Sequence, residues 1–259
     1  MRRPEIKLEN YEAVYRYYRD HGQFGPTSWL GYHAMSLMMS PEVSYEVGAK
    51  DEIRDHIASG GKVIVTPNHL LNTDQYVVAA IVATERVLHP LQGITFVLSR
   101  PDILASNFIQ RRGVDTMGAI PVWREKDDKD KTEAARQLRA KATAMAVETC
   151  VHRIVELGDH GALFRESTRN TGDPRQLLPF KHGASNIILA ANSAGANVLA
   201  LPIAVRYPDS SHKIRRHAEV RIGRLVQDPP TTAEEAALYT TANQGAVQEC
   251  LNYLYPKAS

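Results

Sequence analysis

Cysteine is scarce in this sequence. Only Cys150 and Cys250 occur among 259 residues, and no Cys-x-x-Cys pair is present. Two isolated thiols about a hundred residues apart provide neither a disulfide framework nor the ligand cluster of a structural zinc site. Such sparing use of cysteine fits a reducing compartment, so we expect a cytoplasmic protein without a bound metal ion.

A large excess of charge of either sign is also lacking. The sequence has 31 Lys and Arg residues against 29 Asp and Glu residues, which gives a formal net charge of +2. Proteins that bind nucleic acids usually show a strong basic excess over a domain or along one face. We therefore expect no nucleic-acid partner, and any site for an anion must be a local arrangement of a few basic side chains.

Long uninterrupted hydrophobic runs are absent as well. The first residues, MRRPEIKLEN, return to polar character after the arginines, so we expect no secretory signal and no export. Two uncharged stretches, 21–41 and 184–205, reach about twenty residues, roughly the length that spans a bilayer. Gly25 and Pro26 interrupt the first stretch, and three asparagines interrupt the second. We therefore predict no transmembrane helix.

Aromatic residues and methionines are concentrated near the N-terminus, where two helices are predicted. Tyr11, Val14 and Tyr18 recur at helical spacing, and a second apolar helix is predicted over 28–40, ended by a proline. This hairpin either packs on the protein core or inserts partly into a membrane interface, which aromatic and methionine side chains suit. We treat 1–45 as an N-terminal helical hairpin and a candidate membrane-interface element.

From residue 60 onward, apolar runs of strand length alternate with helical patterns. Strands are predicted at 62–66, 94–98, 119–123, 162–164, 198–205 and 219–222. Helices are predicted at 74–88, 100–111, 132–157, 182–193 and 233–255. This alternation predicts an α/β fold over 46–259, with a central, largely parallel or mixed β-sheet flanked by helices.

The first chemical motif follows the strand predicted at 62–66 and reads TPNHLLNTD, with His69 and Asp74 on either side of a turn. In α/β sheets, ligands gather where strands end and helices begin. The spacing lets the carboxylate accept a hydrogen bond from one imidazole nitrogen, leaving the other to remove a proton from a hydroxyl. The alternative is a structural histidine beside an aspartate that caps a helix.

The second motif, ALFRESTRN, places several polar side chains in the loop after the strand predicted at 162–164. Glu166, Ser167, Thr168 and Arg169 lie together there, and fixed donors of this kind suit a phosphate group. In the alternative interpretation, Glu166 and Arg169 form a structural ion pair.

These motifs, together with three further segments, resemble the glycerol-phosphate and lysophosphatidate acyltransferase superfamily. NHLLNTD matches the family's Asn-His-x4-Asp block, GAIPVWR matches its second block, and FRESTRN matches its Phe-Pro-Glu-Gly-Thr-Arg-Ser block. LPFKHGA, at 178–184, matches the segment that follows, and the sequence Leu-Pro-Ile at 201–203 corresponds to a later strand. The resemblance covers roughly 45–207, and the four blocks occur in the family's order.

The resemblance implies a role for each matching residue. His69 is the general base and Asp74 orients it. Acceptor binding is assigned to Arg100, Arg124, Glu166, Ser167, Thr168 and Arg169. The chain departs from the family in having Arg165 in place of proline and Ser167 in place of glycine. Two alternative interpretations stay open: Arg124 is a solvated surface arginine, and Lys181 has only a structural role in the fold.

The implied reaction is the transfer of a fatty acyl group from acyl-CoA or acyl carrier protein to glycerol 3-phosphate or lysophosphatidate. This is a step of phospholipid biosynthesis, with the thioester as co-substrate and no other cofactor. The resemblance implies a peripheral protein on the inner face of the membrane. The alternatives are the same chemistry on another lipid or glycolipid hydroxyl, and a non-catalytic lipid-binding adaptor on this fold.

Overall fold

The strands that the structure describes form one seven-stranded sheet. The computed structural model describes residues 3–23, 25–104, 113, 115–124, 130–208 and 217–256. In chain order the strands are β1 (Pro41–Tyr45), β2 (Lys62–Pro67), β3 (Thr95–Ser99), β4 (Ala119–Pro121), β5 (His160–Ala162), β6 (Val198–Arg206) and β7 (Ala218–Ile222). Their order across the sheet is β1-β7-β6-β2-β5-β3-β4. Every neighbouring pair is parallel except β6 with β7, so the predicted α/β class with a largely parallel sheet is confirmed.

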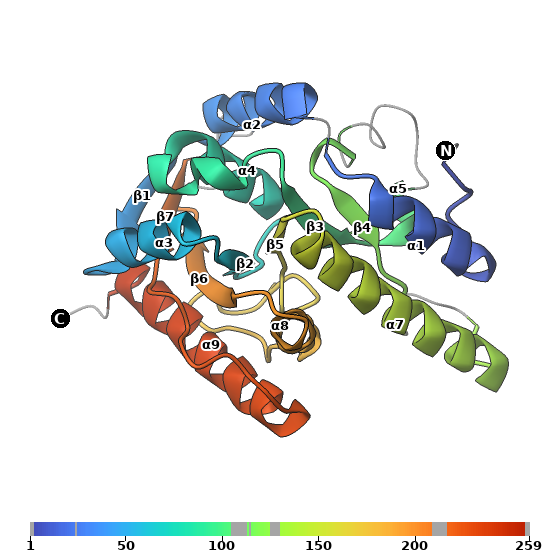
Figure 1. Cartoon of the computed structure of the whole chain (residues 1–259). Coiled ribbons are helices and arrows are strands. Elements are labelled where there is room, and N and C mark those ends of the chain that lie inside the picture. The colour runs from blue at the N-terminus through green and yellow to red at the C-terminus, as the bar shows by residue number, and fades with distance from the viewer. Residues whose placement is uncertain are drawn as a thin grey trace.

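Helices cover both faces of the sheet (Figure 1). On one face lie α2 (Gly25–Met39), α3 (Ala49–Ala58), α4 (Asp74–Thr84) and the 3-10 helix η2 (Arg86–Leu91), with α2 outermost. The opposite face carries α1 (Tyr11–Asp20), α7 (Glu133–Val155), α8 (Gly183–Ser193) and α9 (Ala233–Leu254). Two shorter helices are η1 (Leu8–Asn10) and α5 (Pro101–Leu104).

Strand β2 lies in the middle of the sheet and positions the site described below. Its sequence, KVIVTP, is an almost continuous apolar run, which is typical of a strand covered by helices on both faces. Val63 and Val65 belong to the core under α4, whereas Ile64 belongs to the core under α7 and α8. The carboxyl end of β2 lies at the edge of the sheet where α4 begins.

The N-terminal helices are joined to the sheet by buried hydrogen bonds. Arg153, near the end of α7, forms a buried ion pair with Asp159. Its Nη1 donates to the backbone carbonyl oxygens of Tyr18 at 3.3 Å and His21 at 3.1 Å. Gln23 accepts from a backbone amide of β3 at 3.2 Å. The connection between α1 and α2 is thus tied to the sheet.

Several element boundaries differ from those predicted. The helix predicted at 74–88 ends at Thr84, and η2, which contains Pro90, follows it. The strand predicted at 162–164 lies at 160–162. The helix predicted at 100–111 is present as α5 over 101–104, and the remainder of that range lies outside the described residues.

Strand β1 and helix α3 were not predicted. β1 pairs with β7 at the edge of the sheet, although its residues lie inside the segment predicted as an N-terminal hairpin. The two predicted segments therefore share one sheet, and the division at residue 45 stays a prediction. Among the helices that the structure describes, none has both the length and the apolar character needed to cross a membrane.

Candidate active site

The predicted catalytic pair lies where β2 ends and α4 begins. His69 Nδ1 is 2.9 Å from Asp74 Oδ2, and Asp74 is the first residue of α4. The Asp74 side chain is 1% exposed, whereas that of His69 is 19% exposed. The buried carboxylate thus engages one ring nitrogen, so Nε2 is the nitrogen that can accept a proton from a substrate hydroxyl.

Donors on both sides fix the position of the Asp74 carboxylate. Oδ2 accepts from the backbone amides of Leu70 at 2.6 Å and Leu71 at 2.8 Å. Oδ1 accepts from the Tyr207 hydroxyl at 2.7 Å. Buried carboxylates need such partners, because burying an unpaired charge is costly. The turn that carries His69 therefore folds around Asp74, so the pair is set before any substrate binds.

Tyr207 is a site residue that the sequence motifs did not reveal. It directly follows β6, and β6 pairs with β2, so the carboxyl ends of the two strands meet at the same edge. The available signal was a tyrosine two residues after the strand predicted at 198–205. That signal points to Asp74 only once β6 is known to lie beside β2.

Glu166 links the two chemical motifs. Its Oε1 accepts from the His69 backbone amide at 2.7 Å, and its Oε2 accepts from the Leu178 backbone amide at 2.8 Å. Burial raises the pKa of the Glu166 carboxyl, and the two backbone donors offset part of that effect. Because the side chain is buried and both oxygens are engaged, this geometry gives Glu166 a positioning role. Its contact with an acceptor stays a prediction.

The second motif also contacts His69 directly. The ring of Phe164 packs on the His69 ring with the centroids 4.4 Å apart. The backbone amide of Asn170 donates to the His69 carbonyl oxygen at 2.7 Å. The loop after β5 therefore lies against the turn after β2. The structure brings together the two motifs that the sequence placed about a hundred residues apart.

The two residues that depart from the family pattern have different surroundings. Arg165 points away from His69: its Nη2 donates to Ser185 Oγ at 2.7 Å and Thr240 Oγ1 at 2.8 Å, between α8 and α9. Burial lowers its pKa to about 10. Ser167 has a φ of 56°, the left-handed conformation that glycine adopts without strain. Serine thus keeps the glycine backbone geometry, at a cost of about 1 kcal/mol.

The predicted acceptor residues are only partly assembled. Arg124, which follows β4, donates through Nη1 to the Ser167 carbonyl oxygen and so reaches across to the loop after β5. Arg100 instead forms a two-bond ion pair with Asp102, at 3.0 and 2.7 Å. Thr168 and Arg169 are exposed on the loop. Arg124 is thus joined to the loop after β5, while Arg100 is paired with Asp102.

A family model for acyltransferases matches residues 48–206, which is more than half of the chain. The matched segment contains the His69–Asp74 pair, Arg124 and the loop that carries Glu166. This chain belongs to the acyltransferase family. None of the curated proteins compared with it matches. Membership supports an acyl-transfer reaction, with an acyl donor and a lipid acceptor in general terms. Tyr207 lies one residue beyond the matched segment of this acyltransferase.

Replacing Tyr207 with phenylalanine tests whether its hydroxyl positions Asp74. We expect kcat to fall about tenfold or more with little change in the acceptor KM, because a hydrogen bond to a charged group is worth roughly 1.5 kcal/mol at the low end. Steady-state kinetics measure both constants.

Tyr45→Phe is the matched control, since the Tyr45 hydroxyl also donates to a carboxylate, Glu85, at 2.9 Å but lies outside the site. An unchanged kcat for Tyr207→Phe, or an equal fall in both variants, contradicts the positioning role.

Proposed function

We propose that this acyltransferase moves a fatty acyl group from an acyl thioester to the hydroxyl of glycerol 3-phosphate or lysophosphatidate. The observation that supports it best is the His69–Asp74 pair together with the hydrogen bond from Arg124 to the loop after β5. In this proposal, His69 acts as the base and the Arg124 guanidinium binds the acceptor phosphate, both at the carboxyl edge of the sheet. Acyl-CoA and acyl carrier protein are the two candidate donors.

In the proposed reaction, His69 Nε2 takes the proton of the acceptor hydroxyl as its oxygen attacks the thioester carbonyl. The C–S bond breaks, the carrier leaves as a thiol, and the proton passes from the imidazolium to the thiolate. Asp74 holds the ring and stabilises its positive charge. A positioned general base contributes about 10² to 10⁴ in rate, and substrate alignment supplies further acceleration. The scheme requires no metal or redox cofactor.

The acceptor phosphate is expected to bind between Arg124 and Arg169. The two side chains come from the loops after β4 and β5, so they approach one group from two elements. Thr168 and Ser167 add hydroxyl donors on the same loop. The rival acceptor is another lipid or glycolipid hydroxyl without a phosphate, which these arginines would not favour.

Truncating either arginine tests the acceptor assignment. Arg124→Ala and Arg169→Ala should each raise the KM for glycerol 3-phosphate or lysophosphatidate about tenfold to a hundredfold, because a charge-assisted hydrogen bond is worth roughly 1.5 to 3 kcal/mol. The KM for the thioester should stay nearly constant, because the phosphates of the donor belong to its carrier and are not expected to bind between these two arginines.

Arg175→Ala is the control, because Arg175 is exposed and paired with Asp173 on the same connecting segment. Should both test variants leave the acceptor KM unchanged, or should neither phosphate compound accept an acyl group, the phosphate-acceptor proposal fails.

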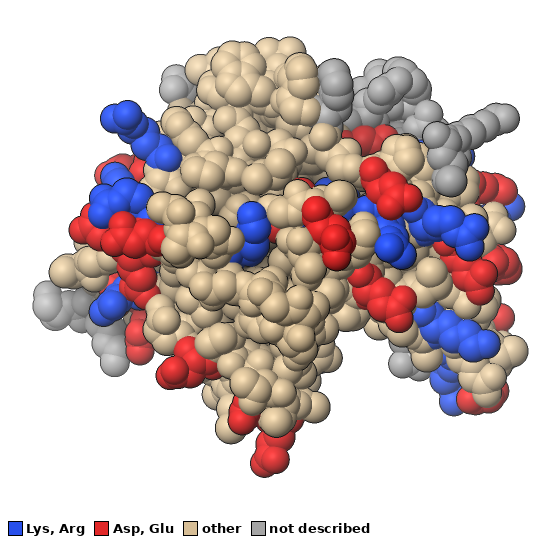
Figure 2. All heavy atoms as spheres, in the orientation of Figure 1, with Lys and Arg blue, Asp and Glu red and all other residues tan. Residues whose placement is uncertain are grey.

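Helix α2 supports peripheral attachment to a membrane. Its sequence, GPTSWLGYHAMSLMM, contains no Asp, Glu, Lys or Arg. Trp29, Leu30, Leu37 and Met38 are all exposed, at 54, 65, 74 and 47%. The space-filling view shows a surface without charged side chains over this helix (Figure 2). We propose that this face rests in the membrane interface, where a lipid acceptor is delivered.

Vesicle flotation tests this attachment. A Trp29→Ser, Leu30→Ser, Leu37→Ser variant should lose most of its binding to phosphatidylglycerol–phosphatidylethanolamine vesicles, since it removes the exposed apolar area. Met39 is not included because it is buried. The control changes Leu238 and Tyr253 to serine, which are exposed on α9. Equal flotation of both variants, or none by the wild type, argues against the membrane role.

A further inference from the structure

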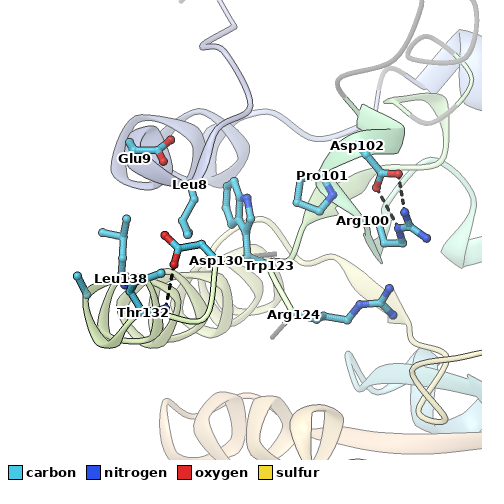
Figure 3. A pocket seen from close by; sticks show the side chains of 12 residues that line it. Leu8, Glu9, Arg100, Pro101, Asp102, Trp123, Arg124, Asp130, Thr132 and Leu138 are labelled. Atoms are coloured by element: carbon cyan, nitrogen blue, oxygen red, sulfur yellow. Dashed lines mark hydrogen bonds and ion pairs between the residues drawn. The ribbon is translucent and has the colours of Figure 1, made fainter. Parts of the chain in front are cut away.

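A cavity of about 560 Å³ has Arg124, a residue of the proposed phosphate site, in its lining. It is bounded by η1, the residues after β3 and β4, and the first turns of α7 (Figure 3). Apolar contacts come chiefly from Leu8, Trp123 and Leu138, and polar ones from Glu9, Arg124 and Asp130. The Trp123 ring is held edge-on by Tyr15, with the ring centroids 5.6 Å apart. The cavity thus has one fixed aromatic wall.

The position of the cavity relates it to the acceptor. In the sheet, β4 is separated from β2 by β5 and β3, so Trp123 lies roughly 15 Å from the end of β2 at the usual strand spacing. Arg124 lines the cavity and also bonds to the loop that packs on His69. A phosphate at Arg124 therefore has the catalytic histidine on one side and the cavity on the other.

We propose that this cavity holds a head group carried by the acceptor phosphate, and that the head group bears an ammonium. The acceptor would then be a lysophospholipid phosphodiester, with its free glycerol hydroxyl at His69. This inference rests on the proposed function and narrows its acceptor class. A phosphate monoester would end at Arg124 and leave the cavity filled only by water.

The charges around the cavity favour a cationic group over an anionic one. Among the residues that the structure describes, the carboxylates of Glu9, Asp102 and Asp130 line the cavity together with Arg100 and Arg124. Arg100 and Asp102 pair and largely balance each other, so Glu9 and Asp130 remain against Arg124, which the acceptor phosphate would engage. In Figure 3 the Asp130 carboxylate lies beside Leu8 and Thr132, whose backbone amide donates to it at 2.9 Å, and Trp123 lines the same cavity. An ammonium there meets an aromatic face and a carboxylate, the two partners that such cations prefer.

The same features disfavour the other occupants of comparable size. The nucleotide of coenzyme A carries several negative charges, and the carboxylates would repel it. An acyl chain would strip water from the charged residues of the wall without replacing their hydrogen bonds. A neutral polyol head group would gain nothing from either Trp123 or Asp130 beyond simple contact. An ammonium alcohol is therefore the class that the cavity fits best.

The test compares acceptors that differ only beyond the phosphate. Purified wild-type protein is assayed with one acyl thioester and four acceptors: lysophosphatidate, lysophosphatidylglycerol, lysophosphatidylethanolamine and lysophosphatidylcholine. We expect kcat/KM for the ethanolamine or choline acceptor to exceed that for lysophosphatidylglycerol about threefold to tenfold, the range expected for an exposed cation–π and charge contact.

Two variants locate the preference. Asp130→Asn and Trp123→Leu should each lower the ratio of kcat/KM for the preferred ammonium acceptor to that for lysophosphatidylglycerol about threefold to fivefold. Glu133→Gln removes an exposed charge at the first residue of α7, three residues after Asp130 and not among the residues that line the cavity, and should leave the ratio unchanged. Thermal unfolding of each variant shows whether it is folded, and a ratio measured on folded protein does not depend on the amount of active enzyme.

The outcomes separate this inference from the proposed function. Equal use of all four acceptors, a preference for lysophosphatidate, or ratios that neither variant changes overturns the head-group site but leaves phosphate-acceptor acyl transfer in place. Failure to acylate any of the four acceptors or glycerol 3-phosphate overturns the proposed function as well.

Discussion

His69→Ala should lower kcat about 10²- to 10⁴-fold, the contribution expected of a positioned general base. The imidazole is the only part of the Asp74-linked pair that reaches solvent, with 19% of the side chain exposed. Alanine leaves the reacting hydroxyl without a group to take its proton. Initial rates of ester formation at saturating donor and acceptor measure the effect.

The fold of this variant should remain intact, because the His69 side chain lies at the end of β2 and outside the buried core. Thermal unfolding checks this point. His56→Ala is the control, since His56 Nε2 bonds to the carbonyl oxygen of Lys62 at 3.0 Å, at the opposite, amino end of β2. A His69→Ala enzyme that keeps more than about a tenth of the wild-type rate contradicts the general-base role.

Asp74→Asn should cause the second-largest loss, about 10²-fold or more in kcat. The aspartate oxygen that holds His69 Nδ1 also accepts from two backbone amides, and the other oxygen accepts from Tyr207. Asparagine has one acceptor oxygen and one amide group, so it cannot accept on both sides. It also removes the negative charge that stabilises the imidazolium.

The kinetic pattern distinguishes this role from a loss of fold. Asp74→Asn should lower kcat while leaving both KM values within about twofold, because the buried carboxylate does not touch either substrate. A normal kcat with a raised acceptor KM would instead indicate that Asp74 binds substrate. Asp173→Asn, an exposed aspartate on the segment between β5 and α8, serves as the control.

Local sequence patterns predicted much of the fold. The run Lys62–Pro67 and the alternating strand and helix patterns after it were sufficient for an α/β sheet, because strands buried on both faces are apolar throughout. The edge strand β1 was missed, since its sequence, PEVSY, is short and half-exposed and has no strong apolar period. Its pairing with β7, about 180 residues later, is a tertiary contact that no local pattern encodes.

The site was predictable to the extent that its parts are local. His69 and Asp74 are five residues apart, so their spacing alone suggested the hydrogen bond that the structure shows. Tyr207 was missed because its contact with Asp74 depends on β6 lying beside β2. The engagement of Glu166 by two backbone amides also depends on strand order, since its partners come from two separate loops.

The most direct test of acyl transfer from thioester to glycerophosphate measures both products in one reaction. Wild-type protein is incubated with acyl-CoA or acyl carrier protein and lysophosphatidate or a head-group-bearing lysophospholipid, and the released thiol and the new ester are quantified together. Direct transfer with His69 as the base requires that thiol release depend on the acceptor, equal the ester formed, and be lost in His69→Ala. Thiol release that proceeds equally without any acceptor, or no ester with any glycerophosphate acceptor, would contradict it.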